Sequence, residues 1–344
     1  MLERRRVLGG LGAAALLTIT GCAGGSELAG AGAGEAAESA GSPSPSSGSP
    51  SATGTETASP APTTMRTEPP LEVDAARRYT VGAPVVIAYG GEHRRQYGEL
   101  IVPQGLPEEV KVPVLMILHG GSWQATSTLG YLRDVARNMA SYGVATWNVE
   151  YRGIGGGGGW PNTFADVAAA MDFVPGLAEH IGRRIDRERF FLAGHSAGGH
   201  LAAWAASRHL DESEQPGGRP ALRPAACVSF AGVYDLAYAQ RLGHRHMVNL
   251  LGGTPSQVPH TYELASPIRN IPEDVEFVCC HSSNDAVVPV AQTANYAAAS
   301  EDAGHDAESV ILPSAGHVDW VIPGSRAWAV GQEQLLEVIT AVRP

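Results

Sequence analysis

The segment from residue 190 to residue 200 constrains the fold of this chain more than any other. A short apolar run leads into a turn bounded by Gly194 and Gly198, and an alanine-rich stretch follows. This order predicts a buried strand, a sharp turn and a helix. The turn matches the pattern G-x-S-x-G, in which glycines prevent clashes between strand and helix and a serine sits on the strained turn. Ser196 is therefore a candidate nucleophile.

The amino-terminal residues predict export. The basic residues 4–6 precede an apolar run from Val7 to about Thr20. At ~1.5 Å per residue this run spans roughly 20 Å, which is short of the ~30 Å core of a bilayer. It is therefore typical of a signal peptide rather than of a permanent membrane span. Residues 4–8 also match the twin-arginine pattern, which is typical of export in the folded state. This route and the general secretory route agree equally well with the sequence.

Residues 19–22, with the sequence Ile-Thr-Gly-Cys, resemble a bacterial lipobox. This resemblance implies that residues 1–22 are a signal peptide with a lipobox, that cleavage occurs before Cys22, and that the Cys22 thiol carries lipid. Several fatty chains, at about 0.8 kcal/mol per buried CH₂, anchor a protein stably. We therefore expect a lipoprotein that is attached to the bacterial cell membrane and faces outward. A chance cysteine near a signal cleavage site is the alternative.

Residues 23–70 and residues 71–344 differ in composition. The first segment consists mainly of Gly, Ala, Ser, Thr and Pro with scattered glutamates, and it is predicted to be a disordered tether because it has almost nothing to bury. Strand patterns begin after Leu71, so residues 71–344 are predicted to form a catalytic domain. The formal net charge of −11 argues against a nucleic-acid partner, which would need a basic face.

Apolar patterns in residues 71–344 alternate between strands and helices. Two opening strands are predicted at 78–89 and 97–102, and further strands at 112–118, 144–149, 190–193, 225–230, 275–280 and 307–312. Helices are predicted at 131–142, 163–178, 290–303 and 327–342. This order predicts one doubly wound, mostly parallel sheet. The insertion between Phe230 and Val275 is too long for a tight loop and is predicted to form a small helical cap that shapes the acyl pocket.

A second glycine turn follows the predicted strand 112–118. It has the sequence His-Gly-Gly-Ser-Trp and covers residues 119–123. Glycines let backbone N–H groups approach a substrate, where these groups stabilise the oxyanion of acyl transfer. We expect the N–H groups of Gly121, Ser122 and Ala197 to form this oxyanion hole. A plain turn is the alternative.

A candidate base and a candidate acid follow two later strands. His317 comes after the last predicted strand, and Asp285 comes after the strand before it. Both therefore lie at the same sheet edge as Ser196, in the chain order Ser–Asp–His. His317 is predicted to take the serine proton, and Asp285 to orient the imidazole. Asp319 is the alternative acid because it lies close to His317 in the chain.

Two further features have both a functional and a structural interpretation. Gly155–Gly159 follow a predicted strand end and form either a mobile wall above the site or an ordinary surface loop. His244 and His246 lie two residues apart, but no third ligand accompanies them, so a solvated helix face is favoured over a metal site. No metal is expected.

Three cysteines fall on predicted strands: Cys227, Cys279 and Cys280. Buried free thiols are common on such strands and are favoured over a bridge from Cys227 to one of the other two. No Cys/His spacing typical of zinc is present.

Four segments together resemble the α/β-hydrolase superfamily, in particular the carboxylesterase/lipase-like branch that includes kynurenine formamidases and feruloyl-esterase-like enzymes. They are residues 119–123, 194–202, 284–289 and 316–317. The resemblance covers about Tyr79 to Pro344 and implies the α/β-hydrolase fold with a Ser-His-Asp triad. Ser282 is a departure, since relatives often carry glycine after the histidine of this strand.

These motifs predict a serine hydrolase that cleaves small-molecule carboxylic esters through an acyl-enzyme intermediate, without a cofactor. Amide hydrolysis by the same residues, as in a formamidase or a peptidase, is one alternative. A catalytically idle hydrolase fold that serves as a surface binding protein is another. The filled positions Ser196, Asp285 and His317 argue against the idle fold.

Overall fold

The computed structural model describes residue 71 and residues 73–181, 185–210 and 216–342, all of which belong to one unit, Thr64–Pro344. The predicted signal peptide, lipobox and tether lie outside these residues, as does Cys22. The boundary between tether and catalytic domain stays a prediction. No helix in the described ranges is long and apolar enough to cross a membrane.

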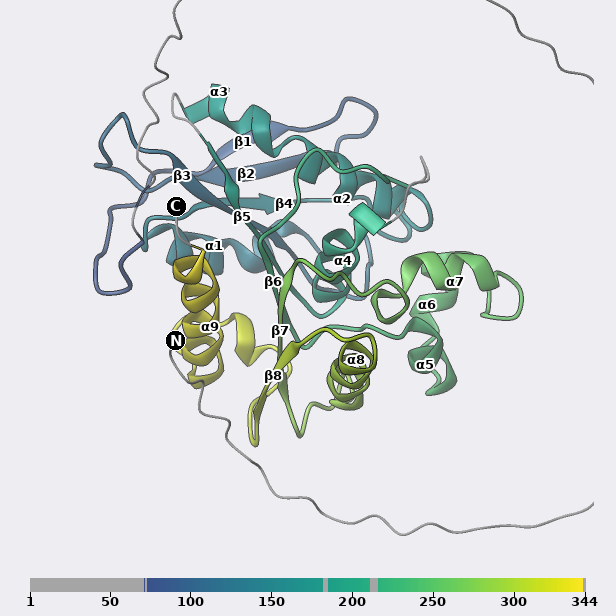
Figure 1. The fold of residues 1–344 in the computed structure, drawn as a ribbon. Coiled ribbons are helices and arrows are strands. Elements are labelled where there is room, and N and C mark those ends of the chain that lie inside the picture. Colours follow the sequence, from purple (N-terminus) through teal and green to yellow (C-terminus); the bar gives the residue numbers. More distant parts are fainter. Residues whose placement is uncertain (1–70, 72, 182–184, 211–215, 343–344) are drawn as a thin grey trace, which may run out of the picture. The chain divides into compact units, whose positions relative to one another are not determined.

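An eight-stranded sheet forms the centre of the described chain, in the order β1-β2-β4-β3-β5-β6-β7-β8 (Figure 1). The β1–β2 and β2–β4 pairs are antiparallel, and all other pairs are parallel. The predicted mostly parallel sheet is therefore confirmed. The strands are β1 (Val85–Ala88), β2 (Tyr97–Ile101), β3 (Val112–Leu118), β4 (Ala145–Val149), β5 (Ile185–His195), β6 (Ala226–Phe230), β7 (Glu276–Ser282) and β8 (Ala307–Leu312).

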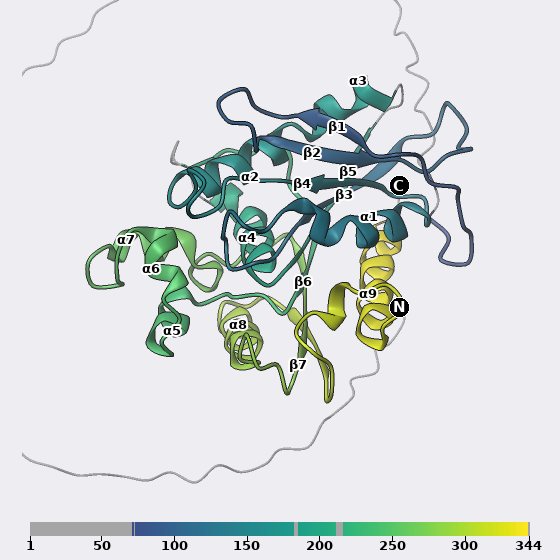
Figure 2. The same cartoon turned by 180° about the vertical axis from the view of Figure 1, so that it is seen from behind.

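Helices cover both faces of the sheet. α1 and α9 pack on one face, and α2, α4 and α8 pack on the other, as the opposite views in Figure 1 and Figure 2 show. The predicted cap is also helical, because α5, α6 and α7 lie between β6 and β7. Its predicted role in shaping the pocket is wrong, since none of its residues is among those that line the pocket around Ser196. The helices are α1 (Arg133–Ala140), α2 (Asn162–Asp172), α3 (Leu177–Ile181), α4 (Ala197–Ala206), α5 (Leu236–Arg241), α6 (His246–Leu251), α7 (Pro259–Ala265), α8 (Ala291–Asp302) and α9 (Arg326–Ala341).

Two apolar cores lie on opposite faces of the sheet, because successive side chains of a strand point in opposite directions. In β3, Leu115 and Ile117 belong to the same core as residues of α1 and α9. Met116 and Leu118 belong to the other core, together with residues of α2 and α4. All residues of β3 are buried. This strand therefore has the apolar character on both faces that is typical of the centre of a parallel sheet.

The helix predicted at 163–178 is interrupted. α2 ends at Asp172, a 3₁₀ turn covers Val174–Gly176, and α3 begins at Leu177. Pro175 lacks the N–H that an α-helix requires, and glycine has a low helix propensity. These two residues therefore end the helix earlier than the apolar pattern predicts.

The three cysteines on strands are free and buried, which confirms the preference for buried thiols over a bridge. Burial raises the pKa of Cys227, Cys279 and Cys280. The thiols therefore stay protonated at neutral pH and pack as small apolar groups.

The turn between β5 and α4 leaves no room for side chains at its glycines. A Cβ atom on Gly194 would overlap the carbonyl oxygen of Gly198, and one on Gly198 would overlap the carbonyl oxygen of Leu118 at the end of β3. Overlap with backbone atoms is relieved only by moving a strand or the helix. The two glycines are therefore required by the close packing of α4 on β3 and β5.

We expect Gly198→Ala to lower the free energy of unfolding by at least about 2 kcal/mol, because the new methyl group would overlap the Leu118 carbonyl. Gly91→Ala is the matched control, since no atom lies within 4 Å of the corresponding position. We expect the free energy of unfolding of this control to change by less than about 0.5 kcal/mol. Urea denaturation of both variants with an unchanged m-value measures the difference. Equal stabilities of the two variants would show that the packing of α4 on β3 tolerates a side chain at position 198.

Candidate active site

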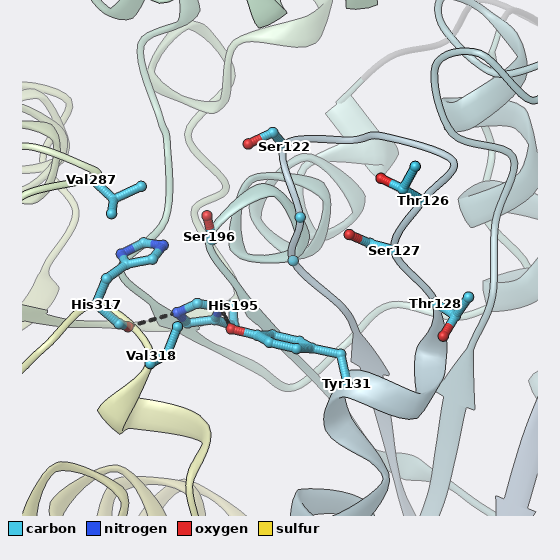
Figure 3. Close-up of a pocket in the computed structure, with 12 residues that line it drawn as sticks. Ser122, Thr126, Ser127, Thr128, Tyr131, His195, Ser196, Val287, His317 and Val318 are labelled. Carbon is cyan, nitrogen blue, oxygen red and sulfur yellow. Dashed lines mark hydrogen bonds between the residues drawn. The ribbon is translucent and has the colours of Figure 1, made fainter.

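Ser196 occupies the tip of the turn between β5 and α4 in a strained backbone conformation. Its φ of 56° and ψ of −119° lie in a region that non-glycine residues rarely adopt. Such a conformation costs on the order of 1–3 kcal/mol and persists only where the surroundings hold it. Here the N–H of Ser196 donates to the carbonyl of Phe230, at the end of β6, over 2.8 Å. The turn directs the Ser196 side chain into a pocket (Figure 3).

This pocket has a volume of about 440 Å³. The loop after β3 lines one side with hydroxyl groups, from Ser122 and residues 126–128 (Figure 3). Val287 and Val318 line the opposite side, and Ser196 lies between the two sides. The pocket therefore combines a polar wall and an apolar wall around the candidate nucleophile.

His317 and Asp285 form a hydrogen-bonded pair beside Ser196. Nδ1 of His317 lies 2.7 Å from Oδ2 of Asp285, whose other oxygen accepts the N–H groups of Val287 and Val288 at 2.8 and 2.9 Å. Burial acts to raise the pKa of Asp285, but hydrogen bonds from His281, His317 and the two N–H groups outweigh it. The pKa of Asp285 therefore lies well below its usual value, and the carboxylate stays charged.

The structure places the alternative acid, Asp319, elsewhere. Oδ2 of Asp319 accepts the N–H of Gly316 at 2.7 Å and so closes the turn that carries His317. The carboxylate that contacts the His317 ring is that of Asp285. The geometry therefore favours Asp285 as the orienting acid.

Ser196 and His317 line the same pocket, as the chain order predicts. No hydrogen bond joins the Ser196 hydroxyl to the His317 ring among the interactions of the described residues. A bond between nucleophile and base often tightens only when substrate closes the site. The structure thus brings the three predicted residues to one place.

The predicted oxyanion-hole residues surround the same pocket. Gly121 and Ser122 line it, with φ of 109° and 53°, and Ala197 begins α4 directly after Ser196. The first N–H groups of a helix have no partner within the helix. Within the described ranges, the N–H groups of Gly121, Ser122 and Ala197 donate no hydrogen bond to the protein. All three are therefore available to a substrate oxygen.

A buried histidine supports the loop that carries Gly121 and Ser122. Nε1–H of Trp123 donates to Nδ1 of His200 over 3.1 Å, and Nε2–H of His200 donates to the carbonyl of Ala265 over 2.9 Å. Burial lowers the pKa of His200 to about 4, so the ring stays neutral. His200 thereby links this loop and α4 to the end of α7 in the cap.

The glycine run 155–159 does not line the pocket. Its neighbour Ile154 exchanges hydrogen bonds with the loop after β3, donating to Trp123 O at 2.7 Å and accepting from Ala125 N at 2.9 Å. The run continues to Trp160, whose N–H donates to Leu250 O in α6. This segment therefore connects that loop to the cap, and the hypothesis of a wall above the site is wrong.

His244 and His246 lie outside the pocket. His246 is exposed and begins α6, whereas His244 is half-buried in the turn before that helix. Only His246 therefore lies on a helix, which corrects the shared helix face predicted for the two residues. Among the described residues, no group of three or more His, Cys, Asp or Glu gathers in a way that could hold a metal ion.

Glu150, at the end of β4, holds a second part of the pocket wall. Its carboxylate accepts from Arg95 at 2.8 Å and from the N–H of Leu129 at 3.0 Å. Arg95 also donates to the carbonyl of Ser127 at 3.1 Å. Sequence reasoning missed this role. A charged residue directly after a fully buried strand is the signal that could have found it, because buried charges need partners.

Sheet order and site together define the class of this protein. A mostly parallel sheet with a strained serine turn after β5, and with Asp285 and His317 after β7 and β8, is the arrangement of the α/β-hydrolase fold. The model of the BD-FAE family matches residues 101–299, more than half of the chain. The chain belongs to the BD-FAE family.

Two curated relatives come from Mycobacterium tuberculosis. The probable carboxylic ester hydrolase LipM is 30% identical over 217 residues, which cover 61% of this chain and 50% of LipM. The esterase LipQ is 29% identical over 240 residues, which cover 67% of this chain and 56% of LipQ. The chain thus spans about half the length of the curated relatives that it matches.

Solved structures share the fold at low identity. Esterase 2 of Thermogutta terrifontis matches with a TM-score of 0.61 and 21% identity, covering 75% of this chain and 92% of that one. A bacterial heroin esterase matches with a TM-score of 0.61 and 20% identity, and the match covers 77% of this chain and 85% of that one. At these identities the likeness shows the fold alone.

We expect the stability of the domain to fall more steeply with acidification than that of a His200→Gln variant. Because the folded pKa of His200 is lowered to about 4, the unfolded chain binds its proton first as pH falls below 6.5. Stability is then lost at up to about 1.4 kcal/mol per pH unit between the two pKa values. Denaturation of both proteins between pH 7 and pH 4 measures this slope. Parallel curves would mean that His200 is not held neutral.

Proposed function

We propose that this protein is a serine hydrolase that cleaves carboxylic esters of small molecules through an acyl-enzyme intermediate. The observation that carries the proposal is the convergence of Ser196 and the His317–Asp285 pair at one pocket. The relatives bear the names carboxylic ester hydrolase and esterase, which favours esters over amides as the substrate class.

In the proposed reaction, Oγ of Ser196 attacks the ester carbonyl carbon while its proton moves to Nε2 of His317. Nδ1–H of His317 donates to Asp285, which orients the imidazole and stabilises the imidazolium. The tetrahedral intermediate then breaks its C–O bond to the alcohol, which leaves with the proton from His317. Water attacks the acyl-enzyme by the same route and releases the acid together with free Ser196.

The oxyanion is stabilised by N–H groups of the backbone. Those of Gly121, Ser122 and Ala197 have no competing partner in the described part of the chain. Donors that are fixed before the reaction cost no reorganisation when the negative charge develops. The ionised state of Asp285 completes this electrostatic pattern, because a neutral acid would not stabilise the imidazolium.

The dimensions and chemistry of the pocket support a small-molecule substrate. A volume of about 440 Å³ falls within the range of small-molecule sites, roughly 300–1,000 Å³. The hydroxyl groups of Ser122 and residues 126–128 can bind polar atoms, and Val287 and Val318 can contact apolar ones. The pocket therefore suits an ester with one polar and one apolar part.

We expect Ser196→Ala and His317→Ala each to lower kcat/KM for p-nitrophenyl esters by at least roughly 1,000-fold, because nucleophile and base act as a unit. A series of esters from acetyl to longer acyl chains, measured on the wild-type protein and both variants, tests this. His246→Ala is the control, since His246 is exposed on α6, and it should keep nearly full activity.

Labelling with a fluorophosphonate probe distinguishes the alternatives. Wild-type protein should be labelled at Ser196, and Ser196→Ala should not. Wild-type rates in Ser196→Ala would overturn the proposed mechanism. Absence of both labelling and turnover in wild-type protein would instead favour a catalytically idle fold that serves in binding. Cleavage of formamides or peptides, but not of esters, would favour the amide-directed alternative.

We further propose that the domain is an exported lipoprotein that is attached to the bacterial cell membrane through Cys22 and faces outward. The basic start, the apolar run and the lipobox-like residues 19–22 support this proposal.

We expect Cys22→Ala to move the full-length protein from the membrane fraction to the soluble fraction of a bacterial host, because the thiol is the proposed site of lipid attachment. Fractionation followed by immunodetection measures this change. Cys227→Ala is the control, because that thiol is buried in β6 and cannot carry an anchor. Unchanged membrane association of Cys22→Ala would contradict the proposed anchor.

A further inference from the structure

The residue before the nucleophile, His195, has a polar partner on each side of its ring. Nδ1 lies 3.1 Å from the hydroxyl of Tyr131, and Nε2 lies 2.8 Å from the backbone carbonyl of His317 (Figure 3). A carbonyl can only accept, so Nε2 carries the proton, and Nδ1 is left to accept from Tyr131. The two partners together define one neutral tautomer of His195.

The loop that carries His317 is held in place by hydrogen bonds to its backbone. We call residues 313–318 the base loop. It follows β8, which pairs only with β7 at the edge of the sheet. Other hydrogen bonds also hold the base loop. Ala315 N donates to Asn284 at 3.2 Å, Gly316 N donates to Asp319 at 2.7 Å, and Pro313 O accepts from Ser283 at 3.1 Å. These partners lie on the neighbouring loop after β7 or within the same turn, as does Asp285, which binds the His317 ring.

His195 joins the base loop to a different part of the sheet. It is the last residue of β5, and Ser196 follows it directly. β5 is separated from β8 by β6 and β7. The hydrogen bond from His195 Nε2 to His317 O therefore connects the strand that precedes the nucleophile directly to the loop that carries the base. It acts on the backbone of His317 itself, next to the side chain that must face Ser196.

The surroundings keep His195 in the state that this contact requires. The residue is 1% exposed, and its ring centroid lies 4.6 Å from that of His317. Burial, together with the nearby His317, lowers the pKa of His195 to about 3. The ring is thus neutral above about pH 3, and over that range its donor stays on the same carbonyl.

We infer that His195 is a positioning residue that holds the base His317 in register with Ser196, and that Tyr131 fixes the His195 tautomer that does so. The inference rests on the proposed function, because His317 must be the base. It assigns His195 no contact with the reacting atoms. It also gives Tyr131, at the edge of the pocket, a role through its hydroxyl rather than through its ring.

The test compares two replacements of His195. His195→Leu fills a similar volume without a donor, and we expect kcat for p-nitrophenyl acetate to fall roughly 10- to 100-fold, as for a displaced catalytic group, with KM within about twofold. His195→Gln places an amide N–H near the position of Nε2, and we expect it to restore kcat to within about fivefold of wild type. Rates are expressed per active site titrated with a fluorophosphonate, so that unfolded protein does not contribute.

A second pair of variants tests the part of Tyr131. We expect Tyr131→Phe to lower kcat about fivefold in the wild-type background, because Nδ1 of His195 loses its donor. In the His195→Gln background the same change should have no further effect, since an amide has no tautomer to select. An equal loss in both backgrounds would show that Tyr131 acts elsewhere and would overturn its role.

Controls separate positioning from stability and from the proposed function. His305→Leu removes a half-buried imidazole from the turn before β8, at the other end of that strand, and should keep wild-type kcat.

Two results would overturn the inference. One is wild-type kcat in folded His195→Leu, and the other is a loss of kcat in His195→Gln as large as that in His195→Leu. If His195→Leu fails to fold, the Tyr131→Phe comparison decides. Full activity in Ser196→Ala would overturn the proposed function instead, whatever the His195 variants do.

Discussion

The structure depends on the close crossing of α4 over β3 and β5. Because Gly194 and Gly198 have no side chains, the helix backbone comes into contact with the Leu118 carbonyl, and the chain must turn within one residue. That residue is Ser196, which adopts a positive φ and is anchored to Phe230 by its N–H. The strain at this turn is balanced by the packing of α4, whose apolar residues belong to the core on one face of the sheet. The same crossing also places the first N–H groups of α4 beside the pocket, so one steric constraint positions both the nucleophile and an oxyanion donor.

The histidines around the site divide into supports and a candidate base. His195 and His200 are buried, and each places one ring nitrogen on a backbone carbonyl, at 2.8 and 2.9 Å. His317 instead places its Nδ1 on the carboxylate of Asp285. A carbonyl dipole holds a neutral imidazole in one tautomer, whereas a carboxylate stabilises the imidazolium. The partner of each ring, rather than the identity of the residue, therefore separates the base from its supports.

The loop after β3, which lines the pocket, is stabilised by contacts from residues outside the pocket. Its residues Ser122 and Trp123 adopt positive φ values of 53° and 56°, which non-glycine residues tolerate only where other contacts compensate. Ile154, His200 and the Arg95–Glu150 pair provide those contacts from three separate elements. In the glycine run beside Ile154, Gly155, Gly157 and Gly159 adopt positive φ values of 81°, 85° and 107°, and Gly158 packs against the carbonyl of Arg152.

Features that depend on nearby residues could be predicted from the sequence. The apolar run 112–118, the glycines of the serine turn and the chain order of Ser196, Asp285 and His317 follow from local pattern and strand polarity, because parallel strands end at one edge of the sheet. Only the tertiary structure decided which polar groups meet. His195 contacts partners 64 and 122 residues away in the chain, and such contacts depend on how strands and loops pack, which local sequence pattern does not encode.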